Sequence, residues 1–528
     1  MDKNKVLVGL SWPYANGRLH IGHVGSSLPA DVLARFHRSI GNDVSFITGS
    51  DCFGTPILVA AHAEGLSPEA LVDKYHALFK KDFAALGFSF DNFTKTISEV
   101  HQKFAQEFHA EMYKGEYAYE KSAAQLYCEK CDKYLPDRYV EGVCPHCNKG
   151  AKGDSCDSCG VILEAEELLT PRCKLCGSTP VSRDKTQMYL KLSALQDRIQ
   201  KFLDERRGKW PANAVGMAQR YLSEGLHDRA ITRSMEWGVP VPKEGWGDKR
   251  IYVWAEAVLG YLSASNAEFI GGSDSPRAPR NKLHYYVHAK DNIPFHAIVF
   301  PGLLMAHGNG EAKYHLPDII VSSEFVNING QKMSKSKGNL VTAEELIDAF
   351  DVDMIRYYFL RTVSDKKDSN FTFADFVHVV NGELVNNFGN LVNRTLAFVK
   401  SRFDGKLQIA NHKLQIIEEA RNEVHQLLWG GSVNKALGRI MELVNFGNKH
   451  FADVKPWLIV ESNPKKCRQD VGEVITIIKA VAEMLVHFIP TSCEKVLGWL
   501  AGDKLPEIEV LFKRLDLKEV QEKFKKYV

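Results

Sequence analysis

Hydrophobic positions in the first hundred residues alternate between strand spacing and helix spacing. Apolar runs at 6–10 and 44–48 have the length of buried strands, and apolar residues recur with helical spacing over 28–40. A further helix is expected to begin after Ser67, which can cap it, and to end at Gly87. This strand-helix-strand order predicts a parallel sheet covered by helices.

The same pattern resumes much later in the chain. Strands are expected at 284–289 and 318–323, with a helix over 295–306 between them and a polar loop at 329–339 after them. From about Asp375 onward strand signals vanish and helical spacing takes over. We therefore expect an α/β protein whose Rossmann-type parallel sheet is split by an insertion and followed by an all-α helical bundle.

Composition narrows the class of protein. The 528 residues suggest three or four domains, and 45% apolar residues exclude a disordered chain. Lys and Arg number 67 against 65 Asp and Glu, so any nucleic-acid binding must use a local basic face. No apolar run has the roughly 18 residues of a membrane span, and the first ten residues lack a signal-peptide pattern. A soluble, cytoplasmic protein is expected.

Cysteines gather in the inserted segment. Eight of the 11 form four Cys-x-x-Cys pairs, Cys128/Cys131, Cys144/Cys147, Cys156/Cys159 and Cys173/Cys176. Eight thiolates suit two closed tetrahedral sites, for which zinc is the expected metal, in a structural role. The spacing leaves two pairings open: sequential, or nested with the inner four cysteines on one ion and the outer four on the other.

Two polar segments carry candidate chemistry. The first, Pro13-Tyr-Ala-Asn-Gly-Arg-Leu-His20-Ile-Gly-His23, follows the first strand and opens a helix, where backbone N–H groups can face a phosphate. The second, Lys332-Met-Ser-Lys335-Ser336, lies in the later polar loop and can gather ammonium groups around a polyphosphate. Taken singly, each is also compatible with surface histidines or a solvated loop.

Together these segments resemble the two signatures of class I aminoacyl-tRNA synthetases, His-Ile-Gly-His and Lys-Met-Ser-Lys-Ser. The Pro-Tyr-Ala-Asn-Gly wording, the cysteine block and Tyr252-Val-Trp254-Ala-Glu-Ala257-Val-Leu-Gly-Tyr261 resemble the methionyl-tRNA synthetase family in particular. No Walker A or Gly-x-Gly-x-x-Gly pattern occurs, which disfavours a P-loop ATPase or a dinucleotide enzyme. The resemblance implies an ATP-dependent ligase that forms methionyl-adenylate and pyrophosphate, then transfers methionine to the 3'-terminal ribose of tRNA(Met).

The resemblance also implies roles for individual residues. His20, His23, Lys332 and Lys335 would be catalytic, and with Tyr14, Asn16, Gly17 and Gly22 would bind ATP, which Mg²⁺ would accompany. Methionine would lie among Trp12, Tyr14, Asp51, Trp254, Ala257, Tyr261, His296 and Phe300, with Asp51 paired to the substrate ammonium. Many relatives carry Trp at the position of Phe300, an aliphatic residue at that of Trp12 and Pro at that of Val258, which puts the shape of the pocket in question.

The helical end would read the tRNA. Asn390 and Arg394 are four apart on one helical face, and Trp457 offers an aromatic plane on which a base can stack. In the family, the matching positions read the CAU anticodon; the alternative is a solvated face and a core tryptophan.

The family resemblance also favours the nested zinc pairing. Nothing after the bundle resembles the appended dimerising module of some relatives, so a monomer is expected.

The domain division expected is a catalytic domain at 1–115 and 230–325, a zinc-binding connective insertion at 116–229, a Lys332-loop and stem-contact region at 326–380, and an anticodon-binding bundle at 381–528. Two rivals stay open. One is another class I synthetase, for valine, isoleucine or leucine, although these usually carry a large editing domain that this length hardly accommodates. The other is a non-catalytic zinc-ribbon RNA-binding protein.

Overall fold

The computed structural model describes residues 3–527 except 157, 160, 162, 272–280, 334–337 and 409–413. The chain divides into two compact units. Unit 1 comprises Met1–Arg18, Gly41–Lys81 and Phe90–Ser322, and unit 2 comprises Leu19–Ile40, Asp82–Ser89 and Ser323–Val528.

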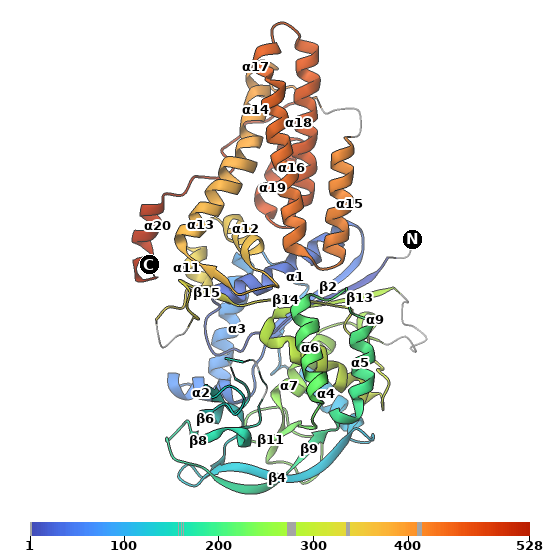
Figure 1. The fold of residues 1–528 in the computed structure, drawn as a ribbon, viewed down its shortest axis with the longest axis vertical. Helices are drawn as coiled ribbons and strands as arrows, with labels where there is room; N and C mark the ends of the chain where they lie inside the picture. The colour runs from blue at the N-terminus through green and yellow to red at the C-terminus, as the bar shows by residue number, and fades with distance from the viewer. Residues whose placement is uncertain are drawn as a thin grey trace. The chain divides into compact units, whose positions relative to one another are not determined.

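Unit 1 is built on a sheet of five strands in the order β14-β13-β1-β2-β3. Figure 1 labels β2, β13 and β14 of this sheet. Strand β1 pairs in parallel with β2 and β13, and β2 pairs in parallel with β3. This is the Rossmann-type arrangement that the sequence predicts, and the strand order reverses between β1 and β13, where such sheets bind their ligands. The strands are β1 (Lys5–Leu10), β2 (Asp43–Ser50), β3 (Asn92–Lys95), β13 (Lys282–Ala289) and β14 (Ile319–Ser323).

The core of unit 1 lies against this sheet. Leu7 of β1 and Ile47 of β2 are buried in one apolar cluster with Phe108 and Leu303, which come from α4 and α10. The Ser67 hydroxyl accepts the backbone N–H of Ala70 at the start of α3, as predicted. The helices are α2 (Thr55–Glu64), α3 (Pro68–Ala85), α4 (Glu99–Met112), α5 (Gln196–Asp204), α6 (Ala212–Glu224), α7 (Val253–Glu256), α8 (Gly260–Ser263), α9 (Ala267–Ile270) and α10 (Phe300–His307).

An antiparallel insertion interrupts the parallel sheet, between β3 and β13. Its long ribbon, β4 (Ala118–Cys128) with β9 (Val181–Leu190), is flanked by β10 (Arg229–Ala230) and β5 (Lys133–Tyr134). A smaller sheet contains β6 (Val140–Val143), β7 (Gly150–Lys152) and β8 (Leu169–Cys173), and β11 (Thr232–Ser234) pairs with β12 (Lys249–Ile251). The sequence therefore predicts the split of the sheet.

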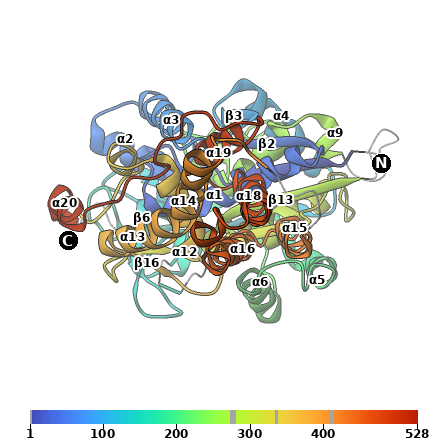
Figure 2. The same ribbon diagram turned by 90° about the horizontal axis from the view of Figure 1, so that it is seen from above.

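Unit 2 joins helix α1 to the C-terminal bundle, whose helices α15, α16 and α18 run side by side and are seen nearly end-on in Figure 2. Its strands β15 (Val326–Ile328) and β16 (Ser369–Phe371) pair in parallel. Its helices are α1 (Ile21–Ser39), α11 (Ala343–Ile347), α12 (Val352–Thr362), α13 (Phe373–Val379), α14 (Asn390–Arg402), α15 (Gln415–Trp429), α16 (Val433–Val454), α17 (Pro456–Ile459), α18 (Pro464–Leu485), α19 (Pro490–Trp499) and α20 (Leu517–Lys523).

A buried ion pair connects α1 to the rest of unit 2. The guanidinium of Arg356 on α12 lies 2.7 Å from the carboxylate of Asp31 on α1, and both side chains are 0% exposed. Arg356 also donates to the backbone oxygens of Phe488 and Leu86. Removing one partner of a buried pair costs about 3–5 kcal/mol, so the contact between α1 and α12 depends on both side chains.

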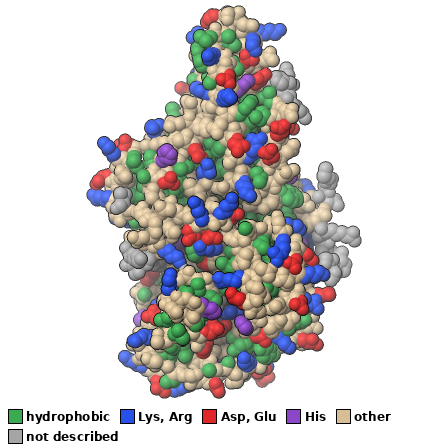
Figure 3. Space-filling view, viewed as in Figure 1, with side chains coloured by type: hydrophobic (Ala, Val, Ile, Leu, Met, Phe, Trp, Pro, Cys, Tyr) green, Lys and Arg blue, Asp and Glu red, His purple; other side chains and the backbone are tan. Residues whose placement is uncertain are grey.

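Charges of both signs are interspersed on the face seen in Figure 3, in keeping with a net charge of +2. Among the residues that the structure describes, no helix has the length and apolar character needed to cross a membrane.

Candidate active site and metal centres

Two backbone loops of unit 1 are joined at the carboxyl ends of their strands. Asp51, after β2, donates its N–H to Pro13 O and accepts the N–H of Ala15 through its backbone oxygen, both at 2.9 Å. This pairing holds Tyr14 and Asp51 as a parallel bridge. The segment predicted to bind the amino acid therefore lies where strands of such sheets present their ligands.

Aromatic rings gather near the Tyr14–Asp51 bridge, and this cluster, the predicted methionine site, is called the cleft below. The Trp254 ring stacks on Phe295 with centroids 3.7 Å apart, and Tyr14 meets Trp254 edge-on at 6.1 Å. Phe295 is a cleft residue that sequence spacing did not single out. Its only signal was its place directly before His296, in a helix predicted to contribute to the same cleft.

Tyr261 contacts two further residues of the predicted methionine site, His296 and Phe300. Its hydroxyl lies 2.9 Å from His296 Nε2, and its ring lies 6.1 Å from that of Phe300. His296 Nδ1 lies 2.9 Å from Asn292 O, so Nδ1 carries the proton and Nε2 accepts the Tyr261 hydroxyl. Burial lowers the pKa of His296 to about 4, which keeps the imidazole neutral. Ala257 is also buried there.

Trp12 occupies a gap that two glycines create. A Cβ on Gly49 or on Gly260 would lie within 2.7 Å of the Trp12 ring. Trp12 also lies edge-on to Tyr261, with centroids 6.4 Å apart. The large ring at this position, noted as a departure from many relatives, is thus accommodated by two glycines that lie against it.

Polar atoms of the cleft are buried without partners among the described residues. These are Trp12 Nε1, Tyr14 Oη and Glu256 Oε1. Two are donors and one is an acceptor, which suits a ligand that carries groups of both kinds, as an amino acid does. Burial raises the pKa of Asp51, and a positively charged group bound beside it would lower that pKa again.

The histidine segment lies in unit 2. His20 is the N-cap of α1 and its Nδ1 accepts the N–H of Gly22 at 3.1 Å, while His23 Nδ1 accepts the N–H of His20 at 3.2 Å. The two rings lie side by side, with centroids 3.9 Å apart. Because each Nδ1 accepts a hydrogen bond, each neutral imidazole carries its proton on Nε2. Both rings can therefore donate from Nε2.

The lysine segment is brought to the histidine segment within the same unit. The N–H of Ile21 donates to Val341 O at 3.1 Å, and His20 forms a bridge with Thr342. A Cβ on Gly22 would come within 3.2 Å of Met333 Cε, the residue after Lys332. Lys332 thus directly precedes Met333, which lies close to the histidine segment. Lys335 lies outside the described residues. Asn16 and Gly17 precede the histidine segment in the sequence and belong to unit 1.

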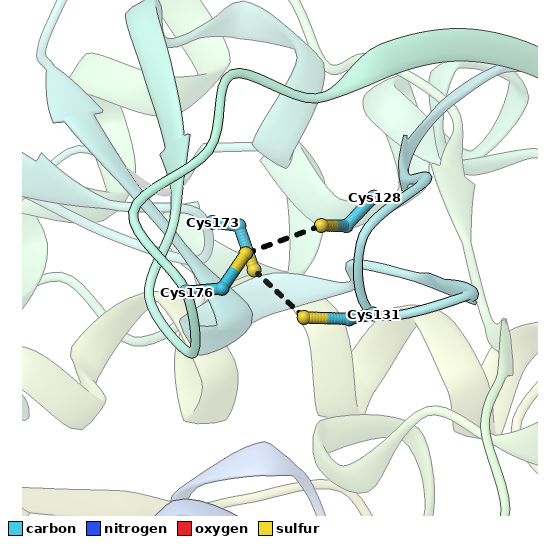
Figure 4. Close-up of side chains that lie close together, drawn as sticks. All are labelled: Cys128, Cys131, Cys173 and Cys176. Atoms are coloured by element: carbon cyan, nitrogen blue, oxygen red, sulfur yellow. Dashed lines mark hydrogen bonds between the residues drawn. The ribbon is translucent and has the colours of Figure 1, made fainter.

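Eight cysteines form two clusters of four thiols. The outer set is Cys128, Cys131, Cys173 and Cys176 (Figure 4), and the inner set is Cys144, Cys147, Cys156 and Cys159; within each set the sulfurs lie within 4.8 Å of one another. This is the nested pairing that the family resemblance favoured. Hydrogen bonds from Ser178 lower the pKa of Cys176 to about 6, whereas the hydrogen bond with Cys176 raises the pKa of Cys131 to about 12.

The sulfur spacing matches a tetrahedral ion. Facing sulfurs are 3.5 Å apart for Cys128 and Cys176 and 3.9 Å apart for Cys131 and Cys173. An ion with metal–sulfur bonds of about 2.3 Å holds its ligands about 3.8 Å apart. The inner set has the same spacing, 3.9 Å for Cys144 and Cys159 and 3.5 Å for Cys147 and Cys156, so either set could hold a metal ion.

The bundle residues predicted to contact tRNA fall into one neighbourhood. The Arg394 guanidinium lies 4.7 Å from the Phe451 ring and donates to Asn448 O, and Phe451 lies 6.3 Å from Trp457. Trp457 is 52% exposed, so it is not a core residue, and Asn390 is exposed at the start of α14. Phe451, which connects the two predicted residues, was not foreseen.

The comparisons with known proteins agree with this geometry. Residues 6–396 match the family model described as tRNA synthetases class I (M). The chain belongs to this family. The chain is 38% identical over 539 residues to methionine–tRNA ligase 1 of Alkaliphilus oremlandii, covering 99% of each chain. It is also 38% identical to methionine–tRNA ligase of Bacillus mycoides, covering 99% of this chain and 98% of the relative.

The fold of this class I synthetase is also that of a solved relative. A Mycobacterium tuberculosis methionyl-tRNA synthetase in complex with methionyl-adenylate superposes with a TM-score of 0.79 at 24% identity, covering 97% of this chain and 100% of the other. The split parallel sheet and the helical C-terminal region are thus family features, as the sequence predicts.

Proposed function

We propose that the protein is a methionine–tRNA ligase. It activates L-methionine with ATP, releasing pyrophosphate, and transfers methionine from the adenylate to the 3'-terminal ribose of tRNA(Met). The observation that carries the proposal is the amino-acid cleft, in which the buried carboxyl of Asp51 lies beside a slot of aromatic rings. Full-length relatives that are named methionine–tRNA ligases support it.

Activation needs positioning and charge stabilisation rather than a covalent nucleophile. The methionine carboxylate attacks the α-phosphorus of ATP, its oxygen forms the new bond, and the bond to pyrophosphate breaks. We assign to His20 and His23 the donation of Nε2–H to phosphate oxygens, which their Nδ1 hydrogen bonds enforce. Lys332 and Lys335 would hold the leaving pyrophosphate. Removing one such donor costs on the order of 3 kcal/mol.

The cleft suits a thioether. Sulfur is polarisable and makes favourable contacts with ring edges, and Trp12, Trp254, Tyr261 and Phe300 supply such rings. The Tyr261 hydroxyl is already used by His296, so it offers its oxygen lone pairs and not a free proton. In this proposal Asp51 pairs with the α-ammonium and fixes the orientation of the carboxylate.

Zinc and magnesium complete the proposal. Zn²⁺ would occupy up to two all-cysteine sites, where full thiolate coordination leaves no position to activate water, so its role is to hold the insertion together. Mg²⁺ would accompany ATP and neutralise charge on its phosphates.

The exposed bundle residues would read the anticodon. Trp457 provides a stacking surface, and the guanidinium of Arg394, which is held by Asn448 and Phe451, can donate to a base edge. Asn390 adds an amide on the same helix.

We assign the proposed tasks to four regions of the chain. Residues 1–115 and 230–325 perform activation, 116–229 is the connective insertion, 326–380 carries the lysine loop and 381–528 binds the anticodon. We expect the protein to act in the cytoplasm as a monomer. Light scattering can test this oligomeric state.

Pyrophosphate exchange into ATP, measured with each amino acid in turn, tests the function. We expect exchange with methionine alone. Exchange that depends on valine, isoleucine or leucine would assign a different specificity, and the absence of exchange with every amino acid would leave only an RNA-binding protein.

A further inference from the structure

A chain of hydrogen bonds in unit 1 runs from buried Glu256 through His101 to half-buried Ser263. The Glu256 carboxyl oxygen Oε2 lies 2.6 Å from His101 Nε2, and His101 Nδ1 lies 2.9 Å from the hydroxyl of Ser263. Ser263 in turn donates its hydroxyl to Gly260 O at 3.3 Å. Glu256 is 0% exposed and His101 is 1% exposed, so water does not compete for these groups.

The direction of these hydrogen bonds fixes one proton. Ser263 gives its only proton to Gly260 O and therefore accepts from His101 Nδ1–H. Burial lowers the pKa of His101 to about 3, so the ring is neutral and its Nε2 holds a lone pair. The hydrogen bond between His101 Nε2 and Glu256 Oε2 therefore requires that the Glu256 carboxyl carry the proton. Glu256 is thus a neutral carboxylic acid, in agreement with a pKa raised well above its usual range by burial.

The second oxygen of Glu256 is left as an acceptor. Oε1 is buried and has no hydrogen-bond partner among the described residues. Glu256 lies near the cleft, because the ring of its partner His101 lies 6.2 Å from the ring of Trp12. Glu256 also directly precedes Ala257 and follows Trp254 by two residues, both of which belong to the cleft. A buried acceptor of this kind costs about 1–3 kcal/mol unless a donor reaches it.

We propose that Glu256 completes the subsite for the substrate's ammonium group: Asp51 supplies the negative charge, and the carbonyl oxygen of protonated Glu256 accepts a second N–H. The ammonium carries one positive charge and three donors, so it is matched by one carboxylate and one neutral acceptor better than by two carboxylates. This inference rests on the proposed function and names a binding residue that the sequence resemblance does not supply.

Two substitutions separate the neutral acid from an ionised one. Glu256→Gln keeps a donor for His101 Nε2 and an acceptor at the position of Oε1. We expect its KM for methionine in pyrophosphate exchange to stay within threefold of wild type. Glu256→Leu removes the acceptor, and we expect the KM for methionine to rise more than tenfold while the KM for ATP is unchanged.

A binding measurement isolates the ammonium. Calorimetry without ATP compares methionine with 4-(methylthio)butanoate, which has the same side chain and carboxylate but no amino group. Glu256→Leu should weaken methionine binding more than tenfold and leave the binding of the deamino compound unchanged. Equal weakening of both would show a packing role and overturn the inference.

The remaining outcomes are also decisive. If wild-type protein shows no methionine-dependent exchange, the proposed function fails; if it does, and Glu256→Leu keeps the wild-type KM, only the inference fails. A tenfold loss in Glu256→Gln would mean that Glu256 is ionised and would contradict it. Should Glu256→Leu not fold, infrared difference spectra of wild type against Glu256→Gln must show the carbonyl stretch of a protonated carboxyl, and its absence would overturn the inference.

Discussion

The amino-acid cleft of unit 1 and the bundle surface of unit 2 both present aromatic rings, but they differ in exposure: Tyr261 is 2% exposed and Trp457 52%. In the cleft, Asp51, Tyr261 and His296 are each at most 3% exposed. Tyr261 and His296 hydrogen-bond to each other, and Asp51 accepts the N–H of Phe53. On the bundle, Trp457 is 52% exposed and its neighbour Leu458 64%. A buried, pre-oriented cleft discriminates a small molecule, whereas exposed aromatic groups can contact a macromolecule. Burial, more than residue type, separates the two proposed tasks.

The largest expected effect is at the charge of the cleft. Asp51→Asn keeps the size of the side chain and removes the negative charge that we assign to the ammonium. Losing one partner of a buried ion pair costs about 4 kcal/mol, so kcat/KM for methionine in pyrophosphate exchange should fall about a thousandfold.

Asp43→Asn is the matched control, because Asp43 lies on the same strand β2 and pairs at the surface with Lys5. Surface pairs contribute about 0–1 kcal/mol, so this variant should keep its exchange activity. Comparable losses in both variants would show that β2 merely needs its charges for folding.

A smaller effect is expected on the bundle. Stacking of a base on an aromatic ring contributes about 1–3 kcal/mol, so Trp457→Ala should lower kcat/KM for tRNA charging by about ten- to a hundredfold and leave pyrophosphate exchange unchanged. Leu458→Ala, next along the chain and more exposed, should change neither reaction. If exchange falls together with charging in Trp457→Ala, the ring supports the fold and the contrast between the two regions is lost.

Crowding the cleft should have an effect of about tenfold. A Cβ at position 260 would lie 2.7 Å from the Trp12 ring, and overpacking of this kind costs about 1–3 kcal/mol. Gly260→Ala should therefore raise the KM for methionine. The double variant Trp12→Leu with Gly260→Ala relieves the clash and should recover much of the loss. No recovery would mean that Trp12 and Gly260 do not act on the cleft through their contact.

The smallest effect for a single residue concerns pH. Burial lowers the pKa of His101 to about 3 and that of His296 to about 4, against 6.5 in the unfolded chain. Between these values the unfolded state binds more protons, so stability is full above pH 6.5 and is lost as the pH falls toward 4. Lowering the pH from 8 to 6 should cost about 0.8 kcal/mol for each such histidine.

Unit 1 buries more histidines with lowered pKa values than unit 2 among the described residues: His76, His101, His109, His284, His288, His296 and His307, against His37 and His487. Hydrogen exchange, corrected for intrinsic rates, should therefore show β13 losing protection before α18 as the pH falls. The reverse order would contradict the assignment of neutral buried imidazoles to the cleft.

Periodicity and motif spacing predict the parallel strands, the split of the sheet and the cysteine clusters, because these depend on local sequence. The predicted strand at 284–289 is β13, Lys282–Ala289, and the nested cysteine pairing follows the family resemblance. Alternation of apolar residues also locates the bundle. These features need no knowledge of which distant side chains meet.

The sequence patterns did not predict the local departures from regular α-helix. The predicted helix at 295–306 begins with a π-helical turn, Phe295–Val299, and a π-helical segment, Val380–Gly389, precedes Asn390. The segment from Trp254 to Tyr261 is interrupted by a 3₁₀ turn, Ala257–Leu259. Such turns re-aim side chains at functional sites, and their hydrogen bonds are set by tertiary packing that spacing does not encode. The Glu256–His101 contact escaped for the same reason, since 155 residues separate its partners.

The most direct measurement is the transfer of labelled methionine to a tRNA transcript that carries the CAU anticodon, beside the same transcript with one anticodon base changed. The account predicts that the first is charged and that the second is charged with a kcat/KM about a hundredfold lower. Equal charging of the two transcripts, or charging of neither, would contradict it.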